Sequence, residues 1–324
     1  MKKLSLIGSG RMAEEYIKVL KFIGTDFNVV STNNDQIEYL KSTYNVDAYC
    51  CDVIDFKSLS QEFVINCVDI PSLFKINLFL LNHGVENILS EKPVAFDSAE
   101  IEKLTSFKNS NFILALNRRF YPSSQEALKI LLSDGVARTC AFQFNERTID
   151  WDHPYSSKGR IENSKPLHSQ SIHLIDLVFH LVGFPKEFTS LMRGNNFRDY
   201  FFSGSGTTDS NCLFSFTSDW SAPGSWAIEI TSKNYRLKFE PLEELIVYNY
   251  SASEKSAIMS GMSNHSISTI RPKLNDENCV SKRFKPGLLS QTEKFIKQDF
   301  ERHGSLSEYA KVLNFINSFS ANSH

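Results

Sequence analysis

Short, largely apolar runs alternate with segments of helical spacing along the first third of the chain. The runs predict strands buried inside a sheet, and the segments between them predict amphipathic helices. The expected strands are 4–7, 27–31, 63–68, 86–90 and 112–116, and the expected helices are 12–22, 36–44, 73–83 and 98–107. Because strands that alternate with helices form right-handed βαβ units, this region predicts a doubly wound, parallel α/β sheet.

The pattern changes after residue 119. Longer β-like runs follow, which favour a large, mostly antiparallel, open sheet in an α+β domain. The expected strands are 139–146, 211–217, 225–231, 235–240 and 245–250, and the expected helices are 123–132, 171–181, 288–301 and 305–319. The Ser-, Gly- and Thr-rich segment 199–209 and the polar segment 251–278 are predicted to be loops. Two domains are therefore expected, 1–119 and 120–324.

Composition is that of an ordinary globular protein. The 324 residues carry 35 Lys and Arg against 37 Asp and Glu, a formal charge of −2, which argues against a nucleic-acid partner. No run approaches the roughly 18 consecutive apolar residues of a membrane span, so no membrane association is expected. The six cysteines form no CxxC pair and no metal-binding rhythm, which predicts reduced thiols and a cytoplasmic protein.

A glycine-rich turn follows the first predicted strand. Residues 8–13 read GSGRMA, a G-x-G-x-x-A sequence between a strand and a helix. Gly8 permits a tight turn, Gly10 lets the backbone approach a pyrophosphate, and the small Ala13 allows close packing of helix on strand. The motif predicts a Rossmann-type dinucleotide site, and the alternative is a turn that only packs. The predicted cofactor-binding residues of the turn are Gly8, Gly10, Arg11 and Met12.

The end of the second predicted strand lacks the carboxylate that usually binds the adenosine ribose. An acidic residue about 20 residues after the glycines normally accepts the 2′-OH. Ser31, Thr32 and Asn33 stand there instead. Hydroxyl and amide side chains bind either a 2′-OH or a 2′-phosphate, whereas a carboxylate would repel the phosphate. The sequence therefore favours NADP over NAD.

Two further segments carry candidate chemistry. Lys92 follows a predicted strand at its carboxyl end, where ligands bind in parallel sheets, and Pro93 restricts the turn after it. The alternative is a solvated Glu–Lys pair in a loop. His173, Asp176 and His180 lie on one face of a predicted helix. A metal bound there would need further ligands that the sequence does not offer, so no metal site is predicted.

These segments resemble the glucose–fructose oxidoreductase / inositol dehydrogenase / MocA (Gfo/Idh/MocA) family. The matching pieces occur in family order over most of the chain, and they are 8–13 (GSGRMA), 70–74 (IPSLF), 91–93 (EKP), 117–122 (NRRFYP), 172–176 (IHLID) and 284–287 (FKPG). The resemblance implies a Rossmann domain followed by an α/β domain whose open sheet forms homo-oligomers. It also implies a nicotinamide cofactor and a sugar or cyclitol substrate.

The resemblance also assigns roles to single residues. Lys92 is similar to the family lysine that contacts both nicotinamide and substrate, and His173 to the histidine that exchanges a proton with the substrate hydroxyl. Asp176 is similar to the carboxylate three residues on. Ser169 departs from the family, which often has Asp four residues before the histidine. The residues expected to border the cofactor are Pro71, Ser72 and Glu91.

The sequence thus predicts an NAD(P)-dependent oxidoreductase that acts on a hydroxyl or keto group of a sugar derivative. Arginines and a lysine expected near the cleft favour a phosphorylated or nucleotide-linked sugar, unless they are surface charges. These cations are Arg118, Arg119, Arg147, Arg160 and Lys165. The residues predicted to bind substrate are Lys92, Arg118, Lys165, Ser169 and Asp176.

Two other functions stay open. One is reduction of a C=N or conjugated bond. Ser169 favours this alternative somewhat, because it stands where the family often has Asp as an acidic helper. The other is a ligand sensor that binds a dinucleotide without turnover. The presence of both Lys92 and His173 argues against the sensor, since a sensor needs neither.

Overall fold

The computed structural model describes residues 4–51, 59–60, 62–146, 167–194, 199–250, 266–270 and 283–321. The chain forms two compact units, one of residues 1–120 with 280–310 and the other of residues 121–279 with 311–324. The sequence placed all of 120–324 in one domain, whereas 280–310 pack with the first unit. Apolar packing explains this, because Leu288 and Phe295 of α8 (Leu288–Ile296) lie in one hydrophobic core cluster with Leu4 and Phe63.

The first unit is built on a sheet whose order, among the described residues, is β3-β2-β1-β4-β5-β6-β15. Its strands are β1 (Leu4–Ile7), β2 (Phe27–Ser31), β3 (Asp47–Cys50), β4 (Phe63–Asn66), β5 (Asn87–Ser90), β6 (Asn111–Leu114) and β15 (Gly304–Ser305). All neighbouring strands pair in parallel except β15, which is antiparallel to β6. The predicted parallel α/β sheet is confirmed, and its order reverses between β1 and β4.

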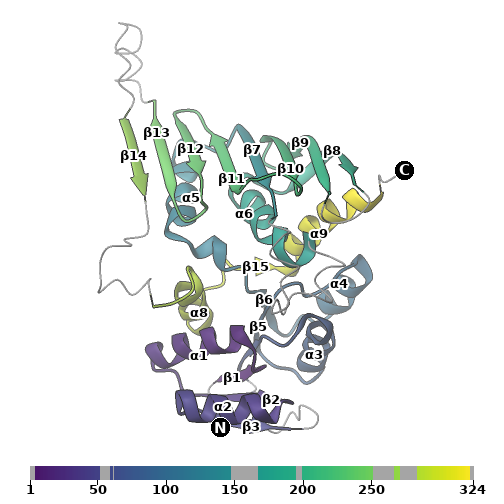
Figure 1. The fold of residues 1–324 in the computed structure, drawn as a ribbon, viewed down its shortest axis with the longest axis vertical. Coiled ribbons are helices and arrows are strands. Elements are labelled where there is room, and N and C mark those ends of the chain that lie inside the picture. The colour runs from purple at the N-terminus through teal and green to yellow at the C-terminus, as the bar shows by residue number, and fades with distance from the viewer. Residues whose placement is uncertain are drawn as a thin grey trace, which may run out of the picture. The chain divides into compact units, whose positions relative to one another are not determined.

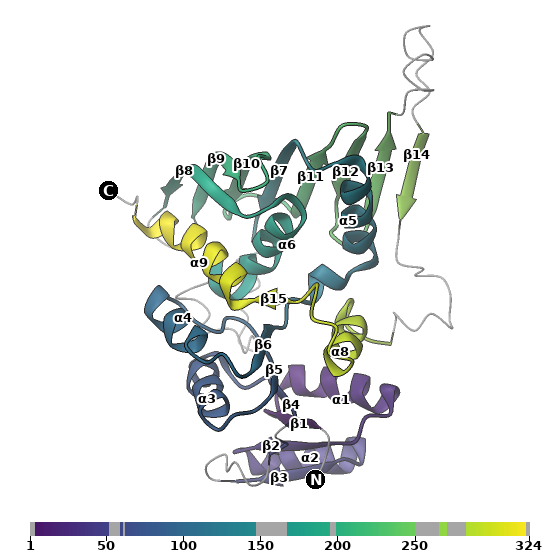
Figure 2. The ribbon, with the colours of Figure 1, turned by 180° about the vertical axis from the view of Figure 1, so that it is seen from behind.

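Helices cover both faces of this sheet. They are α1 (Arg11–Ile23), α2 (Asn34–Tyr44), α3 (Ile70–Asn82), α4 (Ser98–Thr105) and α8. Figures 1 and 2 show α1 and α8 on one side of the strands and α3 and α4 on the other. Because both faces are covered, all four residues of β1 and of β4 are buried.

The second unit is built on a sheet whose described strands follow the order β14-β13-β12-β11-β7-β10-β9-β8. These strands are β7 (Thr139–Phe144), β8 (Pro185–Arg193), β9 (Phe201–Thr208), β10 (Leu213–Asp219), β11 (Trp226–Thr231), β12 (Tyr235–Phe239), β13 (Leu245–Asn249) and β14 (Ser266–Ile270). Strands β7 and β10 pair in parallel, and the other neighbours pair antiparallel. The predicted large, mostly antiparallel, open sheet is confirmed.

One face of the second sheet is covered by α5 (Pro122–Asp134), α6 (Ile172–Val182) and the second-unit part of α9 (Leu306–Ala321), as Figure 2 shows. Phenylalanines at alternate strand positions point to these helices. Phe142 of β7 packs edge-on against Phe179 of α6, with ring centroids 6.0 Å apart. Phe216 of β10 packs on Phe315 of α9 at 5.3 Å. This aromatic layer is the core of the unit.

Two segments that composition assigned to loops contain strands. Residues 199–209 include β9, and 251–278 include β14, while the rest of 251–278 lies outside the described residues. Gly204 and Gly206 of β9 face the backbone of β8, where a Cβ would overlap the carbonyl oxygens of Thr189 and Glu187. The small residues that suggested a loop are therefore those that let two strands approach closely. Strands β3, β8 and the two-residue β15 were also not predicted.

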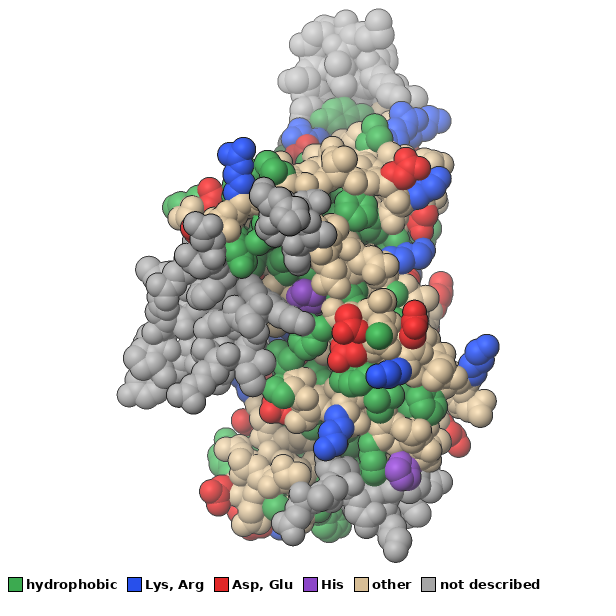
Figure 3. Space-filling model, turned by 90° about the vertical axis from the view of Figure 1, so that its right-hand side faces the viewer, with side chains coloured by type: hydrophobic (Ala, Val, Ile, Leu, Met, Phe, Trp, Pro, Cys, Tyr) green, Lys and Arg blue, Asp and Glu red, His purple; other side chains and the backbone are tan. Residues whose placement is uncertain are grey.

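Charges of both signs are interspersed over the face in Figure 3, in keeping with the near-zero net charge. No helix in the described part of the chain is long and apolar enough to cross a membrane. Cys50, Cys51, Cys67, Cys140 and Cys212 are free thiols.

A buried histidine helps to fix residues 280–310 in the first unit. The Nε2 of His303 donates to the carbonyl oxygen of Gln291 in α8 at 3.1 Å. The His303 ring lies 4.7 Å from that of Phe120 and 6.1 Å from that of Phe300. Nearby, the buried Arg119 pairs with Glu308 at 3.0 Å, so Arg119 has a structural role. Burial lowers the pKa of His303 from its ordinary 6.5 to about 4.

Acid is therefore expected to weaken the fold as the pH falls from about 6.5 to about 4. In this window the unfolded chain binds a proton at His303 that the folded chain does not bind, so the free energy of unfolding decreases. We expect a loss of about 2 kcal/mol between pH 8 and pH 5 from this one group. Urea unfolding of wild type and His303→Gln at both values measures it. Equal pH dependence in the two proteins would contradict the prediction.

Candidate cofactor and active site

The glycine turn lies where the order of the first sheet reverses. Gly8 follows β1 with φ +114°, and its N–H donates to the carbonyl oxygen of Val30 at 2.9 Å. A Cβ on Gly8 would lie 2.8 Å from the carbonyl oxygen of Cys67, just beyond β4. Both the backbone angle and this close approach require glycine. The turn is therefore pressed against the end of β4, the place where ligands bind in such sheets.

Gly10 has a different role in the same turn. It precedes α1 with an ordinary φ of −82°, and a Cβ added to it meets no described atom within 4 Å. Glycine is thus not needed there for the fold. What it leaves is open space at the N-terminus of α1, where backbone N–H groups and the helix dipole favour an anion.

The residues at the end of β2 adjoin the turn. The hydroxyls of Ser9 and Ser31 are 2.8 Å apart, and the N–H of Asn33 donates to the Ser31 hydroxyl at 3.3 Å. The Asn33 side chain accepts from the N–H of Gln36 at 3.1 Å and so caps α2. Ser31 and Asn33 thus make local hydrogen bonds, and Thr32 stands exposed between them. The structure brings this predicted ribose-binding segment and the glycine turn together.

Glu91 ties the end of β5 to α1. Its carboxylate accepts from the hydroxyl of the fully buried Tyr16 at 3.1 Å. Burial raises the pKa of Tyr16 well above its usual value, and the charge of Glu91 raises it further. The next residue, Lys92, is half-buried and precedes a cis peptide bond to Pro93. Lys92 therefore directly follows a residue whose side chain is hydrogen-bonded to α1.

The other predicted site residues of the first unit lie in its turns. Pro71 and Ser72 are in the first turn of α3, which follows β4. Arg118 is half-buried in the 3₁₀ turn Asn117–Phe120, and the Asn117 side chain donates to the carbonyl oxygen of Pro286 at 2.8 Å.

Lys285 is a site residue to which the sequence assigned no role. Its Nζ lies 3.3 Å from the Sδ of Met12 at the start of α1. Desolvation lowers the pKa of Lys285, Glu91 opposes this, and Arg118 and Arg11 lower the pKa further. Lys285 thus adds a cation from a third segment at the start of α1, and its charge interacts with those of Arg11 and Arg118. The matching FKPG segment was the only sequence signal for Lys285.

The second unit holds the remaining candidates. Ser169 lies in the π-helical turn Leu167–Ser171, and His173 and Asp176 are three residues apart in α6, which continues from that turn. All three side chains are buried. Lys92 belongs to the first unit and His173 to the second, so their convergence stays a prediction. Arg147, Arg160 and Lys165 lie outside the described residues.

Comparison with solved structures finds close likeness in fold over the whole chain. Levoglucosan dehydrogenase in complex with NADH and L-sorbose is 15% identical, with a TM-score of 0.76 over 99% of this chain and 96% of that one. UDP-N-acetylglucosamine 3-dehydrogenase GnnA from Acidithiobacillus ferrooxidans is 14% identical, with a TM-score of 0.73 over 99% and 97%. The chain has the Gfo/Idh/MocA fold. The resemblance seen in the sequence is thereby confirmed for the fold.

The Gfo/Idh/MocA fold is also that of a super-repressor mutant of Gal80p from Saccharomyces cerevisiae. That structure is 13% identical, with a TM-score of 0.76 over 98% of this chain and 95% of that one. Neither the comparison with protein-family models nor that with curated proteins found a match.

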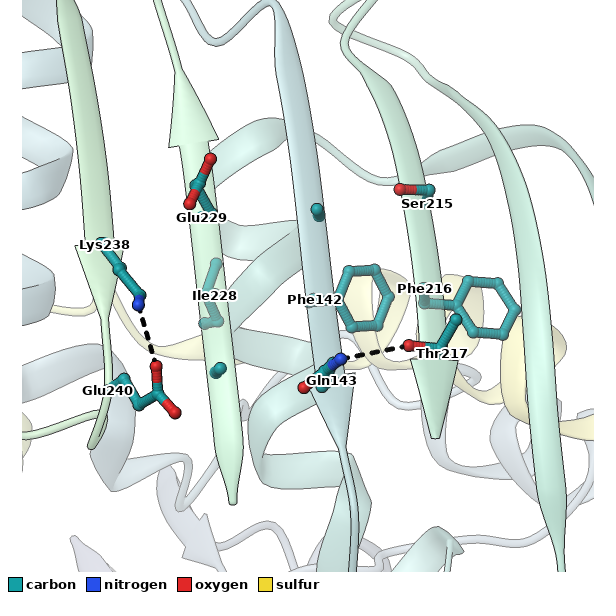
Figure 4. Close-up of a pocket in the computed structure, with 11 residues that line it drawn as sticks. Phe142, Gln143, Ser215, Phe216, Thr217, Ile228, Glu229, Lys238 and Glu240 are labelled. Carbon is teal, nitrogen blue, oxygen red and sulfur yellow. Dashed lines mark hydrogen bonds and ion pairs between the residues drawn. The ribbon is translucent and has the colours of Figure 1, made fainter. Parts of the chain in front are cut away.

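A hollow of about 340 Å³ lies on the second sheet of this fold, away from the helix-covered face. Figure 4 shows side chains of β7, β10, β11 and β12 around it, with Lys238 paired to Glu240 and Gln143 bonded to Thr217. None of the predicted site residues lines it. Among the described residues no group of three or more His, Cys, Asp or Glu side chains is placed to hold a metal.

Proposed function

We propose that this protein is an NAD(P)-dependent oxidoreductase acting on a hydroxyl or keto group of a sugar derivative. The observation that carries the proposal is the Gly8 turn, pressed against the end of β4 at the reversal point of a doubly wound sheet. The likeness in fold to levoglucosan dehydrogenase with NADH and to GnnA supports it.

A dinucleotide fits the residues present. Gly8 admits no side chain, Gly10 leaves space beside it, and the first N–H groups of α1 are available to a diphosphate. The residues that would hold the diphosphate are Gly8, Gly10, Arg11 and Met12, those for the ribose are Ser31, Thr32 and Asn33, and those bordering the nicotinamide are Pro71, Ser72 and Glu91. When bound, the nicotinamide supplies hydride transfer.

Two side chains of this protein would act on the substrate oxygen: one would exchange its proton, and the other would stabilise its negative charge. His173 takes the hydroxyl proton during oxidation and returns it during reduction, acting as general base and general acid. Lys92 stabilises the negative charge that develops on that oxygen. Asp176, one helical turn after His173, orients the imidazole or contacts the substrate. Ser169 leaves the position of the usual acidic helper uncharged.

We propose that the substrate is anionic, a phosphorylated or nucleotide-linked sugar. The half-buried Arg118 is a cation among the site residues of the first unit, and Lys165 adds another cation in the sequence. Guanidinium groups bind phosphate oxygens in a bidentate manner. Turnover on matched sugars with and without phosphate tests this, since equal kcat/KM on both members of a pair would contradict an anionic substrate.

Thr32→Asp is expected to shift cofactor preference from NADP to NAD. The carboxylate would accept the 2′-OH of NAD, while it would repel the 2′-phosphate of NADP. We expect the ratio of Kd values to move by about tenfold or more, about 1.4 kcal/mol. Fluorescence titration with NADH and NADPH measures both constants. Thr32→Asn is the uncharged control, and an unchanged ratio in Thr32→Asp would remove the ribose assignment.

A ligand sensor that binds the dinucleotide without turnover is the second candidate, favoured by the likeness in fold to the Gal80p super-repressor. Assay of NAD(P)H oxidation against keto-sugars, imines and conjugated carbonyl compounds separates the functions. Turnover of keto-sugars supports the proposal, and turnover of imines alone would make the protein an imine reductase. Tight binding of NAD(P)H without turnover of any class would favour the sensor.

We further propose a cytoplasmic homo-oligomer that assembles through the exposed face of the second sheet. Uncharged side chains such as Ala141 and Ser215 stand on that face, and two ion pairs there join Arg236 to Glu229 at 2.8 Å and Lys238 to Glu240 at 3.1 Å. The free thiols suit a reducing compartment. Light scattering measures the mass in solution, and a monomer at micromolar concentration would contradict the assembly.

A further inference from the structure

We propose that a closed ring of hydrogen bonds at the carboxyl ends of β4 and β5 positions Lys92 for catalysis, which makes Asn66, Asn77 and Ser90 positioning residues. The inference rests on the proposed function for its catalytic meaning. The ring itself lies entirely in the first unit.

Four hydrogen bonds close the ring. The Asn66 amide donates to the Asn77 side-chain oxygen at 2.8 Å, and the Asn77 amide donates to the Ser90 hydroxyl at 2.9 Å. The Ser90 hydroxyl donates to the carbonyl oxygen of Glu91 at 3.2 Å. The N–H of Glu91 donates to the carbonyl oxygen of Asn66 at 2.8 Å and completes the circuit.

The three side chains come from three elements and are completely buried. Asn66 and Ser90 are the last residues of β4 and β5 and pair with each other in the sheet, while Asn77 lies in α3. Each of the three has an exposed fraction of 0%. The ring therefore joins the carboxyl ends of two neighbouring strands to the helix between them.

Packing alone does not account for three buried polar side chains. The other buried residues of α3 are Leu73, Leu80 and Leu81, and a leucine at position 77 would suit the same face. Burying amides and hydroxyls costs free energy unless their hydrogen bonds are made. A completed network fixes one geometry of its members, which apolar contacts do not. The ring therefore holds the backbone at the ends of these two strands in one conformation.

The backbone held by the ring immediately precedes Lys92 in the chain. The ring holds both the N–H and the carbonyl oxygen of Glu91, the residue before the lysine. The Glu91 side chain is held in turn by Tyr16 of α1. Asn66 also accepts from the N–H of Val68 at 3.5 Å, next to the Cys67 carbonyl that faces Gly8. The ring thus fixes Lys92 relative to the glycine turn.

Ser90→Ala and Asn77→Leu test the proposal, with Ser5→Ala as the matched control. The Ser5 hydroxyl is equally buried in the same sheet, donates to Asn28 at 2.7 Å and accepts from the N–H of Ser60 at 2.7 Å. It lies in the amino-terminal half of β1, so its loss disturbs the sheet but not the strand ends that carry the site.

Four quantities are measured in each variant. Three are the free energy of unfolding in urea, the Kd for NADH, and kcat with its pH profile. The fourth does not depend on catalytic activity: mass spectrometry follows the rate and pH dependence of acetylation of the Lys92 amine by acetic anhydride. We expect the ring variants to lower kcat by about 10- to 100-fold, since misplacement by about 1 Å has that effect. The acetylation profile of Lys92 should shift with it, while Kd for NADH changes less than about threefold.

Ser90→Thr, which keeps the hydroxyl, should restore both kcat and the acetylation profile. The proposal is overturned if the ring variants lose stability as Ser5→Ala does but retain kcat and wild-type acetylation of Lys92. If Asn77→Leu does not fold, Ser90→Ala alone decides. If wild type binds NADH but turns over no substrate, the proposed function fails, and the acetylation profile still supports or overturns the ring.

Discussion

Lys92→Ala is expected to lower kcat by about 10²- to 10⁴-fold while NADH binding survives, because a positioned group that handles charge or protons contributes that much. Lys92 lies beyond the end of β5 on a backbone held by Glu91 and Asn66, so its removal leaves the glycine turn intact. Stopped-flow or steady-state assay on the best substrate gives kcat, and fluorescence titration gives the Kd. The exposed Lys75 of α3 provides the control, since Lys75→Ala should leave both values unchanged.

His173→Ala should reduce kcat over the same range, about 10²- to 10⁴-fold. His180, on the same helix seven residues on, is the matched control because it has no assigned part in the reaction. The double variant Lys92→Ala/His173→Ala tests convergence on one oxygen. Groups that act as a unit are strongly non-additive, so the double variant should lose little more than either single variant. Near-normal turnover in either single variant, or fully additive losses, would contradict the pairing.

The fold was predictable because its signals are local. Buried strands such as Phe63–Asn66 read as continuous apolar runs, and the helices between them end at glycines such as Gly24 and Gly84 with positive φ. Strand β9 was missed because its Ser, Gly and Thr residues are typical of loops. Their purpose, close approach to β8, depends on a neighbouring strand that the sequence does not reveal.

The candidate site was predictable only in part, for a related reason. Gly8, Gly10 and Lys92 belong to short motifs whose spacing carries a mechanism, so they stand out in the sequence. Asn77 and Lys285 contact residues of other elements, which only the fold brings to them. A buried Asn77 on an otherwise apolar helix face is visible as an exception, but its partners Asn66 and Ser90 are known only from the fold.

The two glycines of the turn should differ in how much the same substitution affects folding. Gly8→Ala places a Cβ 2.8 Å from the Cys67 carbonyl oxygen and forces alanine into a φ of +114°. We expect it to lower the free energy of unfolding by about 3 kcal/mol or more, from strain and overlap combined. Binding of NADH should be lost with the geometry of the turn. Urea unfolding and fluorescence titration measure the two effects.

Gly10→Ala separates binding from folding, because the added methyl group meets no described atom within 4 Å and φ is an ordinary −82°. Alanine is a poorer N-cap than glycine, so a stability loss of only about 1 kcal/mol is expected. The methyl group nevertheless occupies the space through which a diphosphate would approach the N-terminus of α1. The Kd for NADH and NADPH should therefore rise about tenfold or more, equivalent to about 1.4 kcal/mol.

If Gly10→Ala leaves both constants unchanged in a stably folded protein, the diphosphate does not lie over this turn. The glycine sequence would then serve only the contact between Gly8 and Cys67.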